Sequence, residues 1–495
     1  MKYYVRSHTR YRSNKPNYIN SPDSFFVLTS DNWNDYGYET SFYIDFFNKD
    51  EYKEIGLVRI LKKDVERTRT NFLDEFNFLS PEYISLGYNK EYYDSLLNVF
   101  NKEDALKILK DLNDISINGL ETNPYFDIDN EGIQQSFFRS SDARYLYEEV
   151  LNIYFEGQKS SDRDYKFIYK FKKDTTHDID IDIDFSRYNK LPNRLFALIG
   201  KNGVGKTRFL NQLSESLYDS SNPRNKNRFI INETFQVPMY QKVIAISFSV
   251  FDNFFKGESS STELGQEQGE TKKANYTYIG LHKVDGSVYR LSEISETNTT
   301  TFKKLKERNR DKRFIELLNK SRILHENIDT VDESFFHEHY SSGQNIFISM
   351  LCRLLSEIED GSLIFLDEPE LYLHPNAIAS LMNIFFDLLE EYQSYAILCT
   401  HSPILVQEIP ARYVRNLSLI DNDLVQTKAS IETFGANISD ITKDIFNVTE
   451  NESLYKSTLI KLSKELDETE IENLFSAGLS LKARMFLSSL FIKEE

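Results

Sequence analysis

The feature that most restricts the fold of this chain is a glycine-rich loop that directly follows a short apolar run. The run is LFALI, residues 195–199, and the loop is GKNGVGKT, Gly200 to Thr207. A strand followed by G-x-x-x-x-G-K-[ST] predicts a loop whose backbone N–H groups wrap phosphates. In such a loop Lys206 reaches the β and γ phosphates, and Thr207 can ligate Mg²⁺. The residues expected to contact the nucleotide are Gly200, Lys201, Asn202, Gly203, Val204, Gly205, Lys206, Thr207 and Arg208.

Acidic residues and a histidine end two later apolar runs. LIFLDEPE places Asp367 and Glu368 at the end of one run, and AILCTHSP places His401 at the end of another. Asp367 can join Thr207 in the Mg²⁺ shell, while Glu368 can orient and deprotonate the attacking water. Alone, an Asp-Glu pair is commonly a solvated turn and a single His is more often structural. Their order after the phosphate loop favours a catalytic set of Glu368, Lys206 and His401.

The fold expectation comes from four apolar runs without polar alternation, residues 195–199, 243–248, 363–366 and 396–400. Such runs are typical of strands buried on both faces of a largely parallel sheet. We therefore predict an α/β fold with a mainly parallel central sheet, an antiparallel β subdomain and helical insertions.

The stretch YSSGQ, Tyr340 to Gln344, precedes the apolar run NIFISMLCRLL. If that run is a helix, the free N–H groups at its start and its dipole favour an anion. A local role is also expected, because a Ser before a helix satisfies its first N–H groups as an N-cap.

Length and charge limit the remaining possibilities. A chain of 495 residues exceeds one compact core, so we expect two or three domains. A net charge of -18 argues against a generally basic surface that coats nucleic acid. Cys352 and Cys399 lie in apolar runs without metal-type spacing, which favours a reducing compartment. No run approaches 18 apolar residues, so we expect a cytoplasmic protein without a membrane segment.

The predicted organisation has six parts. These are a flexible arm (1–24), an N-terminal β and helical elaboration (25–160), the phosphate-loop or Walker A lobe (161–255), an inserted loop and helical region (256–340), a lobe with the signature, Walker B and switch histidine (341–430), and a C-terminal helical appendix (431–495). Within the insertion, 257–273 reads as a flexible loop, and the charged FKKLKERNRDKRFIELLNK reads as an exposed helix.

The motifs GKNGVGKT, YSSGQ, LIFLDEPELYLHP and AILCTHSP, in this order, resemble the ABC-type ATPases, specifically the soluble branch of SMC, RecF and OLD-type proteins. This resemblance implies ATP and Mg²⁺ as cofactors and a head-to-tail dimer or higher homo-oligomer. It also implies that the signature of one copy, Ser341, Ser342, Gly343 and Gln344, caps the nucleotide of the other. His374 stands at the position of the D-loop residue.

The sequence departs from this family in two places. No Gln follows VIAISFS, where a Q-loop is expected, which leaves Ser249 or Asp252 as weak substitutes, and no adenine-stacking aromatic residue can be assigned. Fewer than 100 residues follow His401, so a whole TOPRIM nuclease domain does not fit. Asp421 and Asp423 are therefore interpreted as a hairpin turn.

The run HDIDIDIDF places four acidic residues on one face of a strand, namely Asp178, Asp180, Asp182 and Asp184. A metal site is one interpretation. The favoured one is an exposed face of like charges that discourages pairing at the edge of a sheet.

A second resemblance concerns partners. DNWNDYGYETSFYI, SPEYISLG and ETFGANISDITKDIF are similar to segments of the PtuA-like ATPases of Septu and retron-linked antiphage systems. This resemblance implies a separate HNH-type nuclease partner, with DNA or a retron reverse transcriptase and its RNA as further candidates. The alternatives are an SMC/RecF-like DNA-repair ATPase that acts directly on DNA, and a transporter subunit.

Overall fold

The computed structural model describes the chain except for residues 10–11, 15–23, 32–36, 50, 71, 122, 139–140, 157–164, 174–177, 219–222, 232–233, 236, 250–253, 255–275, 284–286, 325, 421–422, 446–453 and 492–495. The loop expected at 257–273 lies outside the described residues, as do Asp252 and Asp421. Among the described helices, none has the length and apolar character needed to cross a membrane.

A seven-stranded sheet forms the centre of the molecule, in the order β13-β12-β14-β15-β9-β16-β17. Adjacent strands are parallel except for β17, which pairs antiparallel with β16. The strands span β9 Leu195–Ile199, β12 Val243–Ser247, β13 Tyr276–Gly280, β14 Leu363–Asp367, β15 Tyr395–Thr400, β16 Val414–Ile420 and β17 Asp423–Lys428. All four apolar runs are fully buried strands of this sheet, so the predicted α/β fold is confirmed.

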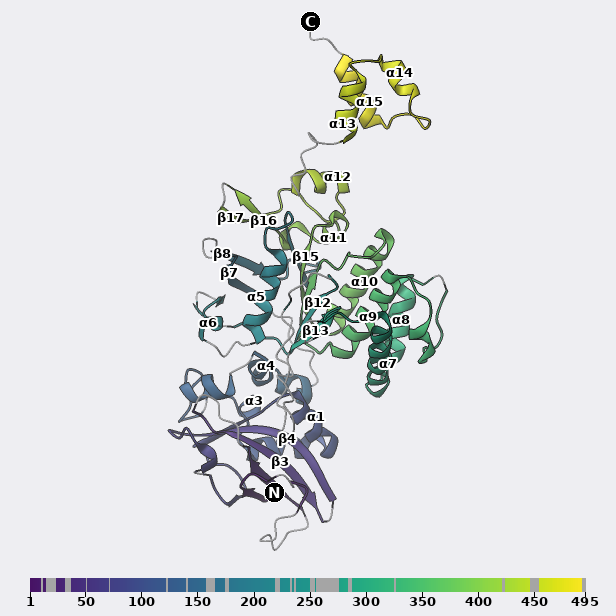
Figure 1. Ribbon diagram of the computed structural model, residues 1–495. Coiled ribbons are helices and arrows are strands. Elements are labelled where there is room, and N and C mark those ends of the chain that lie inside the picture. The colour runs from purple at the N-terminus through teal and green to yellow at the C-terminus, as the bar shows by residue number, and fades with distance from the viewer. Residues whose placement is uncertain are drawn as a thin grey trace.

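Helices cover both faces of the central sheet (Figure 1). On one face lies α5 (Lys206–Tyr218), which packs with the small antiparallel sheet in one apolar cluster. The other face carries four helices, α7 (Leu291–Glu307), α8 (Asp311–Ser321), α9 (Ser342–Glu357) and α10 (Pro375–Glu391). The sheet therefore lies between two apolar clusters, and the helices bury their apolar stripes in these clusters.

The inserted region differs from its prediction as one exposed helix. It forms two helices, α7 and α8, which are separated at Arg310. Phe302, Leu305, Phe314 and Leu317 are buried in the core beside α9. The charged residues occupy only the outer face, because apolar residues recur at helical spacing among them.

The small antiparallel sheet has the order β11-β10-β7-β8. Its strands are β7 (Lys166–Lys172), β8 (Asp178–Asp184), β10 (Phe229–Ile231) and β11 (Thr234–Phe235), and α6 (Pro223–Lys226) precedes β10. The register sets Lys166, Lys170 and Lys172 of β7 opposite Asp184, Asp180 and Asp178 of β8. The acidic row therefore faces a row of lysines, and opposite charges directly across two strands stabilise the pair.

Asp182 is the member of this row that faces an apolar residue, Ile168. Its carboxylate instead lies 3.3 Å from the Arg415 guanidinium of β16. The Gln426 side chain accepts from the Asp182 N–H at 3.0 Å and donates to its carbonyl at 3.2 Å. The Gln426 side chain thus occupies backbone hydrogen-bonding groups at the edge of β8. No cluster of three or more metal-ligating residues occurs in the described part of the chain.

The N-terminal region is a six-stranded sheet with helices, in the strand order β5-β1-β2-β3-β4-β6. The strands are β1 Tyr3–Arg6, β2 Ser24–Ser30, β3 Ser41–Asn48, β4 Glu51–Lys62, β5 Glu75–Phe76 and β6 Tyr83–Gly87. The helices are α1 Lys90–Val99, α2 Lys102–Asp111, α3 Ile115–Asn118 and α4 Ser141–Val150.

The prediction of a flexible arm over 1–24 is wrong for its first residues. Tyr3–Arg6 forms β1, which is parallel to β2 and antiparallel to β5. Tyr3 is fully buried, and its ring stacks on Phe26 and Phe76 at 5.1 and 4.9 Å between centroids. Burial of aromatic rings outweighs the polar composition around them.

In the described part of residues 431–495 the chain forms helices and no strand. The β16–β17 hairpin, in which Ile420 pairs with Asp423, precedes them. The short helices α11 (Pro403–Val406) and α12 (Ile438–Asp440) lie close to the sheet. The last three helices, α13 (Leu454–Leu462), α14 (Glu468–Asn473) and α15 (Leu481–Phe491), form a small unit with its own apolar cluster (Figure 1).

One carboxylate joins three parts of the molecule at the amino ends of the central strands. Glu359, two residues after α9, accepts from Lys90 of the N-terminal region and from Arg308 after α7, each at 3.1 Å. Burial opposes the charge on Glu359, but Lys90, Arg308 and Arg310 together outweigh burial and lower the pKa of this carboxyl. Gly361 lies against the ring of Tyr145 in the same contact.

Glu359→Gln is expected to lower the free energy of unfolding by about 2 kcal/mol, because Lys90 and Arg308 lose a charged acceptor. A lowered pKa in the folded state stabilises the fold above the ordinary value of 4.5 and loses this effect as the pH falls through the folded value. The deficit of the variant should therefore shrink in acid. Urea unfolding at pH 7 and pH 4 measures it, with exposed Glu390→Gln as the control; equal stability at pH 7 would contradict the role of Glu359.

Candidate nucleotide-binding and hydrolysis site

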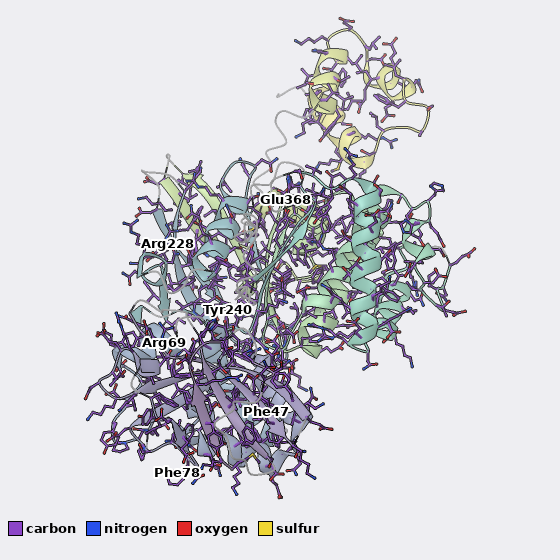
Figure 2. All side chains as sticks on the ribbon, turned by 60° about the horizontal axis from the view of Figure 1, so that its bottom comes forward. Phe47, Arg69, Phe78, Arg228, Tyr240 and Glu368 are labelled. Atoms are coloured by element: carbon purple, nitrogen blue, oxygen red, sulfur yellow. The ribbon has the colours of Figure 1, made fainter. Side chains whose placement is uncertain are left out.

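The predicted site residues meet at the carboxyl ends of β9, β14 and β15. These strands are neighbours in the sheet, with Asp367 opposite Cys399 and Thr400 opposite Ile199. Figure 2 shows Glu368 at the end of the central body that faces away from the N-terminal region. Parallel strands place their carboxyl ends at one edge, which is where α/β sheets bind ligands.

The glycine-rich loop closes tightly around the start of α5. A Cβ at Gly200 would clash with the carbonyl oxygen of Leu417 on β16, and Gly205 has a φ of +113°, which side chains disfavour. Lys206 is 5% exposed, and its ammonium donates to the carbonyl of Gly200 at 2.8 Å and to that of Lys201 at 3.4 Å. The ammonium thus lies within the curve of the loop, where it can reach bound phosphates.

The two predicted Mg²⁺ ligands lie side by side. The Thr207 hydroxyl donates to Asp367 at 3.2 Å, and Asp367 is 3% exposed at the end of β14. A hydroxyl and a carboxylate are hard oxygen ligands, and Mg²⁺ commonly takes one or two protein oxygens together with phosphates and water. The donor set therefore fits Mg²⁺ held jointly by Thr207, Asp367 and a triphosphate.

Glu368 and His401 form a second pair at the same edge. The Oε1 atom of Glu368 is 3.1 Å from Nδ1 of His401, and both side chains are partly exposed. The backbone of Glu368 has a φ of +46°, and its N–H donates to the Cys399 carbonyl at 2.8 Å. A left-handed conformation at a non-glycine residue costs on the order of 1 kcal/mol and is frequent at functional sites. Here it turns the carboxylate toward His401.

Glu370 is a residue of this site that the sequence interpretation missed. Its Oε1 accepts from the Thr400 hydroxyl at 2.5 Å and from the His401 N–H at 3.3 Å, and lies 3.9 Å from the imidazole. Its Oε2 is buried without a hydrogen-bond partner, and burial raises the pKa of this carboxyl. The only sequence signal was a third acidic residue in DEPE, because the contact depends on β15 lying beside β14.

The signature stretch begins α9 as an N-cap. The Ser341 hydroxyl accepts from the Gln344 N–H at 3.3 Å, and the Gln344 side chain accepts from the Ser341 N–H at 2.9 Å. The Gln344 amide also donates to the Ile323 carbonyl at 3.0 Å. The local role of Ser341 as an N-cap is therefore confirmed, while Ser341 and Ser342 remain exposed.

The signature also contacts the segment that follows the acidic pair. A Cβ at Gly343 would clash with the carbonyl oxygen of Tyr372, so this position requires glycine for close packing. Tyr372 itself has a φ of +68° and is 51% exposed. His374 is exposed, and its carbonyl accepts from Ala377 and Ile378 at the start of α10. These contacts fix the local conformation of the segment between Glu370 and α10.

A cavity of about 360 Å³ adjoins the loop on the side of β16. It is lined by residues 200–204, by 416–420 and by Ile445.

Of the two residues considered as Q-loop substitutes, Ser249 follows β12 and Asp252 is outside the described residues.

Comparison with known proteins gives one family match and one curated relative. Residues 270–407 match the family described as an AAA domain, putative AbiEii toxin, type IV TA system. This segment contains the signature, Asp367, Glu368 and His401. The chain is 26% identical over 517 residues to "Protein ea59" of Escherichia phage lambda, which covers 94% of this chain and 95% of that protein.

Solved structures with partial similarity include ATP-binding cassettes. cbiO1 of Clostridium perfringens, part of an ABC transporter complex, has a TM-score of 0.30 at 16% identity and covers 63% of this chain and 99% of its own. UvrA2 of Deinococcus radiodurans has a TM-score of 0.30 at 12% identity and covers 57% and 40%. The AAA-domain match and the site geometry support a P-loop ATPase.

Glu370→Gln is expected to lower kcat about tenfold, the scale typical of a group that orients another functional side chain. Nucleotide affinity should stay unchanged, because Glu370 contacts Thr400 and His401 and not the phosphate loop. Steady-state ATPase assays together with titration of a fluorescent ATP analogue separate the two effects. The exposed Glu390→Gln is a matched control, and a kcat equal to wild type in Glu370→Gln would refute the positioning role.

Proposed function

We propose that this chain is an ABC-type ATPase in which ATP closes two copies head to tail and hydrolysis reopens them. The observation that carries the proposal is the meeting of two pairs at one sheet edge, Thr207 with Asp367 and Glu368 with His401. One chain supplies one phosphate loop and one exposed signature start, so closure by a two-fold axis gives two equal sites.

The proposed reaction uses the side chains in distinct roles. Lys206 and the loop N–H groups bind the β and γ phosphates, and Mg²⁺, when bound at Thr207 and Asp367, neutralises charge on them. Glu368 orients the attacking water and accepts its proton. His401, 3.1 Å from Glu368, holds the water or the γ-phosphate in line with that carboxylate. Ser341 and Gly343 of the second copy cover the bound nucleotide and complete the site.

We further propose that this cycle regulates an associated HNH-type nuclease in antiphage defence. The support is the resemblance to PtuA-like ATPases, together with a matched family whose description names a toxin of a toxin–antitoxin system. A relative encoded by a phage is consistent with this setting. ATP shifts the assembly only by the difference in its affinity for the closed and open states.

Glu368→Gln is expected to bind ATP, hydrolyse it at least 100-fold more slowly, and accumulate the closed dimer, because the proton acceptor is lost while the phosphate contacts remain. Size-exclusion chromatography with small-angle X-ray scattering, with and without ATP and Mg²⁺, measures the mass and the radius of gyration of the assembly. Lys206→Ala is the control that should show no response to ATP. A Glu368→Gln assembly that neither gains mass nor becomes more compact with ATP would refute nucleotide-driven closure.

Lys206→Ala is also expected to abolish defence in cells that carry the chain with its neighbouring genes, because the phosphate loop loses its cation. Plating efficiency of a phage panel measures the effect. Lys201→Ala, which removes a neighbouring cation from the same loop, is the comparison, and its effect should be the smaller one. Undiminished defence by Lys206→Ala would mean that the role in defence does not depend on ATP.

A further inference from the structure

The small C-terminal unit, residues 454–491, exposes an unusual amount of apolar surface. Its core consists of four buried side chains, Leu459, Ile471, Ala483 and Leu487. Eight large apolar side chains are exposed, namely Leu454, Tyr455, Ile460, Leu474, Phe475, Leu481, Met485 and Phe491. Leu454 is 81% exposed, Leu481 75% and Met485 66%. Five further apolar residues, Leu462, Leu466, Leu479, Phe486 and Leu490, are partly buried against this core, so the unit exposes nearly as many apolar side chains as it packs inward.

A unit of this size rarely folds stably by itself. Domains below about 40 residues usually need disulfides, metals or oligomerisation, and the two cysteines of this chain lie elsewhere, at Cys352 and Cys399. On α15, Leu481 and Met485 are four residues apart and share one helix face, while Ala483 and Leu487 occupy the buried face. The outer face of α15 therefore has the pattern of a contact surface, not of a solvated helix.

Charge indicates what this surface contacts. Residues 454–491 contain five basic residues and five acidic residues, so the unit is neutral, while the whole chain carries -18. Most of the lysines and most of the acids lie on different helices, while Glu472 of α14 is paired with Arg484 of α15 at 2.8 Å. Lysines 456, 461 and 464 lie on or just after α13, and the acids Asp467, Glu468, Glu470 and Glu472 lie at the start of or along α14. A two-fold axis can set α13 of one copy against α14 of another, so that opposite charges meet.

We propose that residues 454–491 form a self-association surface that joins two copies of this chain without nucleotide. The surface carries both lysines and acids, and its zero net charge lets two strongly acidic chains approach there without net repulsion. A stable contact of this kind buries about 800 Å² on each partner. In Figure 1 the unit stands apart from the central body, on the side of α11 and α12.

Such a contact has a consequence for the catalytic cycle proposed above. Two chains joined by their C-terminal units hold their ATPase bodies at a high effective concentration. Closure on ATP then becomes an event within one assembly. The C-terminal contact itself does not depend on ATPase activity, so it can be tested with the full chain in EDTA and without nucleotide.

The test is sedimentation velocity of the full chain at 1–50 μM (about the range over which a micromolar contact dissociates). Wild type should sediment as a dimer, and Leu481→Glu with Met485→Glu should sediment as a monomer. Phe78→Glu is the matched control, because Phe78 is 68% exposed on the N-terminal region, far from α15 (Figure 2). The control should remain a dimer, and circular dichroism should show all variants folded.

A second variant tests the charge arrangement. Lys461→Glu with Lys464→Glu places acids opposite the acidic α14 of the other copy and should also give a monomer, without changing any apolar residue. A wild-type monomer throughout this range, or a dimer that survives the Leu481→Glu and Met485→Glu changes, would overturn the proposal. The proposal would also be overturned if a monomeric wild type captured a different protein, because this surface would then bind that protein and not a second copy.

Discussion

Everything at the nucleotide edge depends on the register between three parallel strands. Because β14 pairs with β15 and β15 with β9, Asp367 lies beside the start of α5 and Glu368 lies beside His401. Backbone hydrogen bonds fix this register, and the buried apolar residues on both faces prevent it from slipping. A shift by one residue would reverse every side chain and separate both pairs, so the chemistry follows from the sheet.

The sequence predicts the elements that carry their own signal. The apolar runs are the central strands, the loop 200–207 precedes α5, and Ser341 caps α9. Features that depend on residues far apart in the chain were missed. β1 looks polar until Tyr3 stacks between Phe26 and Phe76. Glu370 becomes part of the site only when Thr400 comes beside it.

The acidic run of β8 shows why composition alone was insufficient. Its alternation correctly indicated an edge strand with an outward acidic face. The sequence did not show that lysines of β7 lie opposite, or that Arg415 and Gln426 cover the one position that lacks a lysine. Pairing across strands depends on the turn and on the fold. The aspartates of β8 look mutually repulsive when the sequence alone is read, but the folded sheet places basic side chains opposite them.

Helix α9 links the two ends of the central body. It begins at the exposed signature, and two residues beyond its last turn Glu359 holds Lys90 and Arg308. Sixteen residues at 1.5 Å each make a rod of about 24 Å. Such a rod acts as a lever arm: a tilt of about 10° at the signature displaces its far end by about 4 Å, the scale on which packed interfaces switch. A displacement at the signature therefore reaches the Glu359 contact that joins the N-terminal region to the central body.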